Sequence, residues 1–249
     1  MWAAWSWYRF LQPLSFELEL AVDGKLQSSE KAHVRNLFPG LSFFEIEPIL
    51  LPLCEQRPEL YRFFHQHPLG RKLGLLLALS QRQSFLYSDH DVLAFKPPIE
   101  LMECVEANRA AYIREERDGN CDFTISEMST SLGLEPIPRF NSGLMYVPRG
   151  SLSIDLAAQL LASWQVERTS WFTEQTVLSI LMRKVDAQPL PHRRYVVSSC
   201  RQFYWQNDVD YQSIAARHFT GTVRHVMYRY GIPEILRQVV SVESANGKP

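Results

Sequence analysis

Two short apolar runs, at residues 84–88 and 92–95, flank the triplet Asp89-His90-Asp91. The pattern predicts a buried strand that ends in two carboxylates one residue apart. Carboxylates at the end of a core strand can hold a hard divalent cation such as Mg²⁺ or Mn²⁺, whose usual second partner is a diphosphate. The triplet therefore favours an enzyme that handles a nucleotide or phosphoryl substrate. Taken alone it is not specific, because aspartates after a strand also serve as turn residues or helix caps.

Apolar periodicity predicts strands and helices that alternate along most of the chain. We expect strands at residues 15–22, 41–46, 84–88, 111–114, 144–147 and 195–197, and helices at 27–37, 48–64, 70–79, 100–107, 154–164, 173–184 and 233–242. Such alternation is typical of an α/β fold with a largely parallel sheet flanked by helices. Ligands of open α/β sheets bind beyond the carboxyl ends of the strands, where Asp89 and Asp91 are placed. Residues 118–140 show little periodicity and are expected to form a long loop.

The length and charge of the chain restrict its class. Its 249 residues, 46% of them hydrophobic, suit one large core. We expect one domain over residues 1–249, with a core at 14–231 and a frayed tail at 243–249. The net charge of −1 argues against a bulk nucleic-acid binder.

Cysteine usage and hydropathy favour a cytoplasmic protein. The four cysteines are widely spaced without a Cys-x-x-Cys pair, which suggests neither a zinc site nor a disulfide framework. No run approaches the roughly 18 apolar residues that span a bilayer, and the first residues lack the basic region of a signal peptide. The three tryptophans within residues 1–7 suit either a peripheral contact with a membrane surface or the buried face of a first helix, and we favour the helix.

Two polar segments accompany strands or helices later in the chain. Asn141-Ser142-Gly143 stands before a predicted strand, where a glycine lets the backbone approach a ligand closely. The alternative is a simple turn before an edge strand. Glu174-Gln175 opens a predicted helix, where acidic residues are common because of the helix dipole.

A third segment runs from His218 through Gly221 to Arg224. A histidine can bind a metal, although a lone histidine is more often structural. The glycine would allow close backbone approach, and the arginine offers a fixed fork of donors to phosphate.

Taken together and in this order, four segments between residues 70 and 231 resemble the landmarks of the GT-A glycosyltransferases, and among these the glycogenin and lipopolysaccharide galactosyltransferase group. They are Asp89-x-Asp91, Asn141-Ser142-Gly143, Glu174-Gln175 and His218-x-x-Gly221-x-x-Arg224. The resemblance implies a Rossmann-like mixed, mostly parallel sheet flanked by helices. It also implies a hexosyltransferase-type enzyme that transfers a sugar from a UDP- or GDP-sugar to a carbohydrate, lipid or protein acceptor.

The resemblance further implies a role for each motif residue. Asp89, Asp91 and His218 would ligate Mn²⁺ or Mg²⁺, which bridges the donor diphosphate. The other implied positions are Gly221 and Arg224 around the diphosphate, Lys72 or its rival Arg71 facing the donor, Asn141, Ser142 and Gly143 along the donor sugar, and Glu174 and Gln175 near the transferring sugar carbon. The cation and Arg224 would stabilise the leaving diphosphate. We expect acceptor contacts within residues 118–140.

Three departures from the family pattern leave other functions open. The family opens with a strand whose loop holds the base, whereas residues 1–14 look helical here, so we expect that strand to be missing or replaced. Arg224 stands where lysine is usual, and Glu174 where aspartate is usual. One alternative is a haloacid-dehalogenase-type phosphatase, which also uses Asp-x-Asp after a strand. The other is a non-catalytic GT-A-like binding protein with an incomplete donor site.

Overall fold

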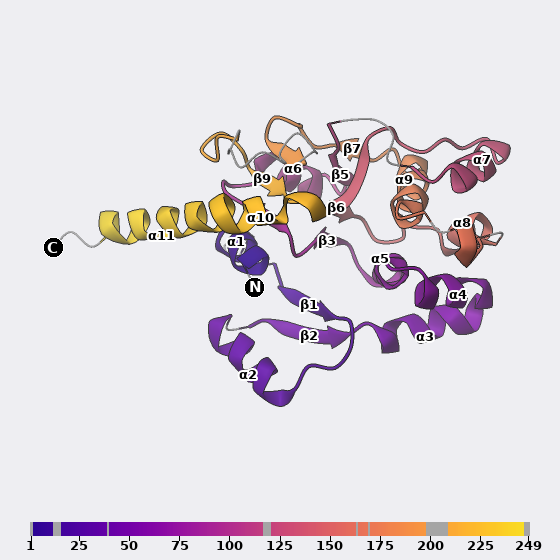
Figure 1. Ribbon diagram of the computed structural model, residues 1–249, viewed down its shortest axis with the longest axis horizontal. Coiled ribbons are helices and arrows are strands. Elements are labelled where there is room, and N and C mark those ends of the chain that lie inside the picture. The colour runs from indigo at the N-terminus through magenta and orange to yellow at the C-terminus, as the bar shows by residue number, and fades with distance from the viewer. Residues whose placement is uncertain are drawn as a thin grey trace.

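The computed structural model describes residues 2–11, 16–38, 40–116, 121–162, 164–168, 170–197 and 209–246. Helix α1 (Trp2–Leu11) opens this part of the chain (Figure 1). It packs against strand β4 (Val92–Ala94). Trp7 is buried and its indole Nε1 donates to the carbonyl of Val92 at 3.2 Å, while Trp2 remains 40% exposed. The expectation that the early tryptophans belong to the buried face of a first helix therefore holds for Trp7.

A small parallel sheet follows α1. It consists of β1 (Glu19–Val22) and β2 (Ser42–Glu45), which are joined by helix α2 (Ser28–Leu37). Figure 1 shows this unit on the lower side of the molecule, beneath β3. In the described part of the chain, helix α1 is the element that precedes β1.

Three helices lead from this unit to the strand that carries the aspartates. They are α3 (Glu47–Gln56), α4 (Pro58–Gln66) and α5 (Gly70–Arg82). The single helix expected at 48–64 is therefore divided. The chain leaves the helical conformation at Arg57, which precedes Pro58, whereas Pro52 lies inside α3 without ending it.

The largest sheet has the order β3-β6-β5-β7, with β3 (Phe85–Ser88), β5 (Ala111–Arg114), β6 (Phe140–Val147) and β7 (Gln188–Pro189). Every residue of β6 is buried, because helices cover both faces of the strand. Met145 and Val147 pack in one core with helices α5, α8 (Ile154–Leu161) and α9 (Thr173–Lys184). Leu144 and Tyr146 pack on the other side with helix α6 (Ile99–Glu106).

The second sheet brings a late strand beside the aspartates. Its order is β4-β9-β8, with β8 (Tyr195–Val197) and β9 (Ala216–His218). The free edge of β4 is closed by side chains of α1, since the Ser6 hydroxyl accepts from the Ala94 N–H at 3.0 Å and Arg9 donates to the Ala94 carbonyl at 3.0 Å. The first helix thus fixes the strand that follows Asp91.

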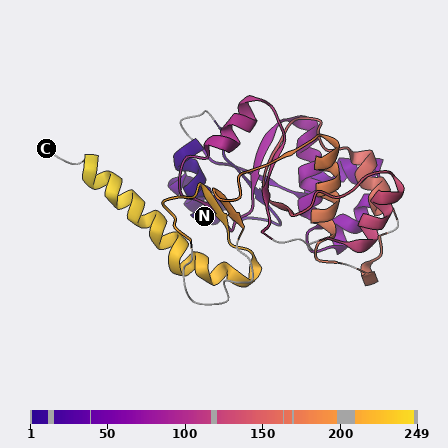
Figure 2. The same cartoon turned by 90° about the horizontal axis from the view of Figure 1, so that it is seen from above.

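The chain ends in one nearly continuous helical stretch. A short 3-10 turn (Gly221–Val223) leads into α10 (Arg224–Val226), a π-helical turn (Met227–Gly231) and α11 (Ile232–Asn246). Figure 2 shows α11 projecting away from the body of the molecule. We expected this helix to end at 242, with a frayed tail at 243–249. It continues to Asn246, and residues 247–249 lie outside the described part of the chain.

The α/β class and the mixed sheet are confirmed, with corrections in detail. Three of the described strand pairings are parallel and three are antiparallel, so parallel pairs do not predominate among them. Residues 118–140 are not one loop, because helix α7 (Phe123–Ser131) forms there, begun by Asp122, whose side chain accepts from the Ile125 N–H. None of the described helices has the length and apolar character needed to cross a membrane.

Candidate metal and donor site

Asp89 and Asp91 lie in a tight turn between β3 and β4. The Asp89 N–H donates to the Gly143 carbonyl at 2.7 Å, and the Val92 N–H donates to the Asp89 carbonyl at 3.1 Å. The Asp91 carbonyl accepts from the Phe219 N–H at 2.9 Å. These backbone bonds tie the turn to β6 on one side and to the end of β9 on the other, so both carboxylates are held where the two sheets meet.

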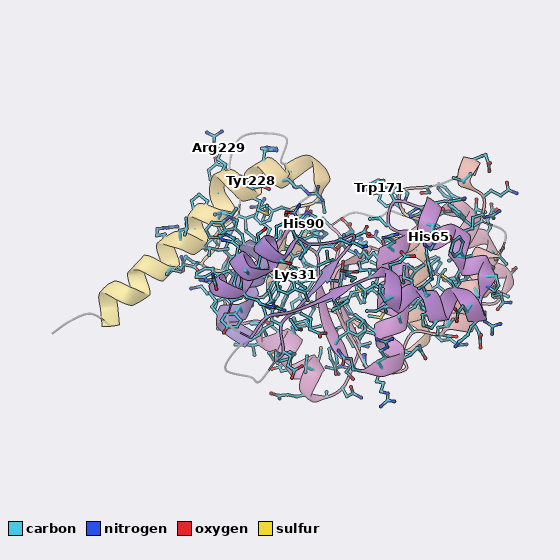
Figure 3. All side chains as sticks on the ribbon, turned by 90° about the horizontal axis from the view of Figure 1, so that it is seen from below. Lys31, His65, His90, Trp171, Tyr228 and Arg229 are labelled. Carbon is cyan, nitrogen blue, oxygen red and sulfur yellow. The ribbon has the colours of Figure 1, made fainter. Side chains whose placement is uncertain are left out.

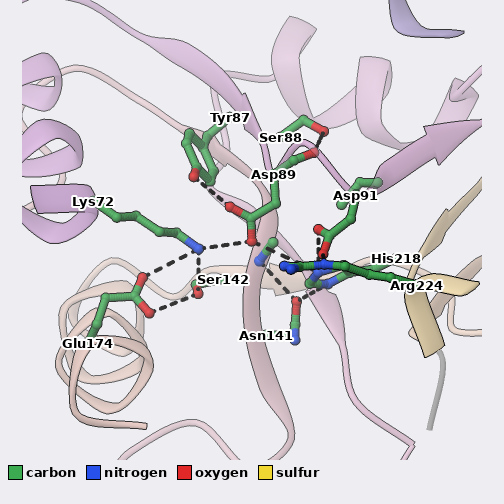
Figure 4. A network of polar contacts seen from close by, with 12 residues as sticks. Lys72, Tyr87, Ser88, Asp89, Asp91, Asn141, Ser142, Glu174, His218 and Arg224 are labelled. Atoms are coloured by element: carbon green, nitrogen blue, oxygen red, sulfur yellow. Dashed lines mark hydrogen bonds and ion pairs between the residues drawn. The ribbon is translucent and has the colours of Figure 1, made fainter. Parts of the chain in front are cut away.

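His218 reaches the two carboxylates from β9. It is the register partner of Val92, which places it beside the turn. Its Nε2 lies 3.1 Å from Asp91 Oδ1 and 3.9 Å from Asp89 Oδ2, and the residue is buried (Figure 4). Ligand atoms of all three residues lie within 4.8 Å of one another. The structure therefore brings together the three residues that the sequence predicts as metal ligands.

Gly143 makes room for the imidazole of His218. A Cβ built on Gly143 would come within 3.0 Å of His218 Cε1, His218 Nδ1 and Asn141 Oδ1, a distance that real Cβ contacts essentially never show. We expected this glycine to allow close approach of a ligand, but the group that approaches it in the structure is a side chain of the protein.

Asn141 points to His218. Its Oδ1 lies 2.9 Å from His218 Nδ1 and accepts from the Gly143 N–H at 2.9 Å, while its Nδ2 donates to Glu115 Oε1 at 2.7 Å. These contacts engage both ends of the amide within the protein. The sequence predicts Asn141 along the donor sugar, whereas these contacts favour a role behind the histidine.

A buried ion-pair network lies on the other side of Asp89. Lys72 Nζ donates to Asp89 Oδ2 at 3.1 Å and to Ser142 Oγ at 3.0 Å, and it lies 3.6 Å from Glu174 Oε1 (Figure 4). Ser142 Oγ donates to Glu174 Oε2 at 3.2 Å, and Tyr87 donates its phenolic proton to Asp89 Oδ1 at 2.6 Å. Glu174, which opens α9, is thereby joined to the strand end that carries Asp89.

Electrostatics differ sharply between the two ends of the site. Burial alone would raise the pKa of the Asp91 carboxyl, but hydrogen bonds from His218 and Arg224 hold it well below its usual range. Burial raises the pKa of Glu174, and Lys72 only partly offsets this effect. Burial would lower the pKa of Lys72, but Asp89 and Glu174 raise it above its ordinary value. Asp91 is thus strongly ionised, whereas the charge on Glu174 depends on Lys72.

Arg224 and Gly221 lie at the exposed side of the metal ligands. Arg224 Nε donates to Asp91 Oδ2 at 2.8 Å, and its side chain is 49% exposed. Gly221 opens the preceding 3-10 turn, is exposed, and has no atom within 4 Å of an added Cβ. The structure brings Arg224 into the cluster through Asp91.

Arg71 and Gln175 are placed differently from their neighbours in the sequence. Arg71 turns away from the site to pair with Asp23 and, at 2.7 Å, with Glu47, so Lys72 is the basic residue of α5 that contacts Asp89. Gln175 is buried beside Glu174 in the first turn of α9.

Comparison of the sequence with models of protein families identifies the family of the chain. The family model of the nucleotide-diphospho-sugar transferases matches residues 66–228, a span that contains every residue of the cluster. The chain belongs to this family. As a nucleotide-diphospho-sugar transferase it is a glycosyltransferase, which agrees with the GT-A resemblance and leaves the phosphatase alternative without support.

Structural comparison supports the same fold. The transferase is similar to the apo form of mouse xyloside xylosyltransferase 1, with a TM-score of 0.54 and 11% sequence identity, over 83% of this chain and 84% of the other. At that identity the likeness speaks for the fold alone. Comparison with curated protein sequences gives no significant match.

Two residues of the transferase site escaped the sequence interpretation. Tyr87 stands two residues before Asp89, and side chains at that spacing share a strand face, so the period of two was a usable signal. Glu115 directly follows β5, at a strand end like that of Asp89, but nothing in the sequence shows that Asn141 lies opposite.

Lys72→Met is expected to lower the free energy of unfolding by about 3–5 kcal/mol at neutral pH, because Glu174 would remain buried without its cation. The raised pKa of Glu174 means that the folded state holds this proton more tightly than the unfolded state. The variant should therefore lose stability as the pH rises above the ordinary range of a glutamate. Urea unfolding across that range measures the effect.

The neighbouring residue supplies a matched control. Arg71→Met removes a charge from the same helix, but its partially exposed ion pairs should contribute no more than about 1 kcal/mol. Lys72→Met combined with Glu174→Gln should recover most of the lost stability. A pH-independent loss in Lys72→Met that Glu174→Gln fails to rescue would contradict this account.

Proposed function

We propose that the transferase is metal-dependent and uses Asp89, Asp91 and His218 to hold a divalent cation against the diphosphate of a nucleotide-sugar. The observation that carries the proposal is the convergence of their ligand atoms. Atoms bound to one ion at about 2.1 Å are at most about 4.2 Å apart. The separations of His218 Nε2 from Asp91 Oδ1 and Asp89 Oδ2, 3.1 and 3.9 Å, meet this limit, and the ligand atoms of all three residues lie within 4.8 Å of one another.

The mixed ligand set favours Mn²⁺ over Mg²⁺. Carboxylates suit both ions, but an imidazole nitrogen suits a transition metal better than magnesium, which prefers oxygen and water. When bound, the cation would supply positive charge to the departing diphosphate. The low pKa of Asp91 keeps that ligand ionised at neutral pH.

Arg224 is proposed to add a second positive charge to the diphosphate. Its Nε donates to Asp91 Oδ2. Because 49% of the side chain is exposed, its remaining N–H groups can reach an anionic ligand. Gly221 lies three residues earlier in the exposed turn, where the lack of a side chain lets a phosphate approach the backbone.

The donor sugar is proposed to lie toward Lys72, Ser142 and Glu174. These three side chains form one polar surface beside Asp89 and reach it from α5, β6 and α9. Gln175 follows Glu174 and is proposed to complete this side of the pocket. Because the buried groups bond one another in this structure, a sugar hydroxyl would join or replace bonds of a preformed network.

The acceptor is proposed to approach over two exposed aromatic side chains. Trp171 precedes Glu174 by three residues and is 63% exposed, and Tyr228 follows Arg224 by four residues and is 65% exposed. Figure 3 shows both at the upper edge of the view, with His90 between them. Exposed aromatic faces of this kind suit an amphipathic ligand such as a sugar ring.

A thermal-shift panel of UDP and GDP, with and without Mn²⁺, tests the proposed function. Ligand at about 100 times its Kd stabilises the folded state by about 2.7 kcal/mol. For a chain of this size we expect a rise in Tm of about 5–10 °C for the preferred nucleotide with Mn²⁺. Release of that nucleotide from its sugar conjugate then reports turnover.

Each other outcome of the panel has a definite meaning. An equal shift with and without Mn²⁺ would refute metal dependence while leaving donor binding intact. Binding without any turnover, across sugar donors and simple glycoside acceptors, would favour the non-catalytic alternative. No shift with any nucleotide would refute the proposed donor site.

A further inference from the structure

Asn141 joins His218 to an acidic side chain at the end of a neighbouring strand. Glu115 lies just beyond β5, and its Oε1 accepts from Asn141 Nδ2 at 2.7 Å. Asn141 Oδ1 in turn lies 2.9 Å from His218 Nδ1. The contacts run in one line from a carboxylate, through an amide, to the histidine.

The orientation of the Asn141 amide follows from its neighbours. An ionised carboxylate only accepts hydrogen bonds and a backbone N–H only donates them. Glu115 therefore requires the NH₂ group on its side, and the Gly143 N–H, 2.9 Å away, requires the carbonyl oxygen on the other. A flipped amide would place its oxygen against the Glu115 carboxylate and its NH₂ group against the Gly143 N–H, so these two contacts select one orientation.

That orientation decides which imidazole nitrogen keeps its proton when a cation binds. Asn141 Oδ1 can only accept, so His218 Nδ1 must donate to it. His218 Nε2, which lies 3.1 Å from Asp91 Oδ1, is then the nitrogen that would exchange its proton for a cation. The ring is also held in place by Gly143, against which it packs.

We propose that Glu115 and Asn141 form a positioning pair that presents His218 Nε2 to the divalent cation. The inference rests on the proposed metal-dependent function, and it assigns to Asn141 a task behind the histidine. Partners of this kind orient metal-bound histidines, and losing one typically costs 10–100-fold in metal affinity. Glu115 acts through Asn141, so its contribution should depend on that residue.

A double-mutant cycle tests the pair, with the affinity of each variant for Mn²⁺ alone measured by calorimetry. We expect Asn141→Ala to weaken Mn²⁺ binding about 10–100-fold and Glu115→Ala to weaken it about 3–10-fold. In the Asn141→Ala background, Glu115→Ala should have no further effect. Glu115→Gln should stay within about threefold of the native protein, since its amide oxygen can accept the same hydrogen bond.

A neighbouring glutamate serves as the charge control. Glu116→Ala removes an exposed carboxylate one residue away and should leave Mn²⁺ affinity unchanged. Equal losses in Glu115→Ala and Glu115→Gln that persist in the Asn141→Ala background would show that the charge acts at a distance, and would overturn the proposal. Full Mn²⁺ affinity in Asn141→Ala would also overturn it.

The Nδ1 proton of His218 gives a readout that needs no metal. In long-range ¹H–¹⁵N spectra, with the signals assigned through His218→Gln, we expect Nδ1 to carry a slowly exchanging proton in the native protein and a rapidly exchanging one in Asn141→Ala. If the native protein fails to bind Mn²⁺ but shows this Nδ1 proton, the metal function fails and the positioning pair stands. An Nδ1 without a proton in the native protein would overturn the pair.

Discussion

Asp91→Asn is expected to weaken Mn²⁺ binding by at least about 100-fold and to abolish Mn²⁺-dependent nucleotide binding with it. The loss should exceed the 10–100-fold typical of an outer partner, because the substitution replaces an ionised ligand by a neutral amide. Asp91 is the more buried aspartate and accepts from both His218 and Arg224. The amide would turn its NH₂ group toward one of these two donors. Calorimetry with Mn²⁺, then with nucleotide, measures both losses.

The same variant should show a characteristic change in stability with pH. The folded-state pKa of Asp91 lies below its ordinary value, so its carboxylate stabilises the fold above the unfolded pKa and this contribution is lost as the pH falls through the folded pKa. The stability gap between the native protein and Asp91→Asn should therefore be widest near neutral pH and narrow in acid. Asp155→Asn, which removes the charge of an exposed ion pair with Arg57, is the matched control and should leave metal binding unchanged.

Local patterns predicted much of the fold because the relevant signals lie within a few residues. The spacing of apolar residues located α9 at Thr173–Lys184 and β8 at Tyr195–Val197 with their observed bounds. The same reasoning missed α7, whose apolar residues are too few to form a clear stripe. Local patterns did not predict whether neighbouring strands run parallel or antiparallel. The antiparallel pairing of β6 with β3 and β5 is set by contacts between residues that are distant in the sequence.

The candidate site divides in the same way. Residue types and order indicated Asp89, Asp91 and His218, and the structure brings them together. Their supporting contacts were beyond the sequence, because Asn141 meets Glu115 and His218 only once β5, β6 and β9 lie side by side. The resemblance placed Arg224 near the diphosphate, but only the structure shows its hydrogen bond to Asp91.

Gly143→Ala is expected to disable the metal site although it adds one methyl group at a residue that we do not propose as a ligand. The new Cβ would come within 3.0 Å of two atoms of the His218 ring and of Asn141 Oδ1. Gly143 lies in a fully buried strand held between β3 and β5, so the backbone has little room to retreat and the imidazole must move. We expect Mn²⁺ affinity to fall by at least about 100-fold as Nε2 leaves the carboxylates.

A control variant at a second closely packed glycine distinguishes loss of Mn²⁺ binding from a general loss of stability. Gly74→Ala would also place a Cβ within 3.0 Å of a neighbour, the side chain of Leu50, and overpacking of this kind costs about 1–3 kcal/mol. Gly74 is two residues from Lys72, which puts the two on opposite faces of α5. Both variants should therefore unfold at lower urea concentrations than the native protein, but only Gly143→Ala should lose Mn²⁺ binding. Native Mn²⁺ affinity in Gly143→Ala would mean that the cation does not depend on His218 in its observed position, and the three-residue metal site would have to be abandoned.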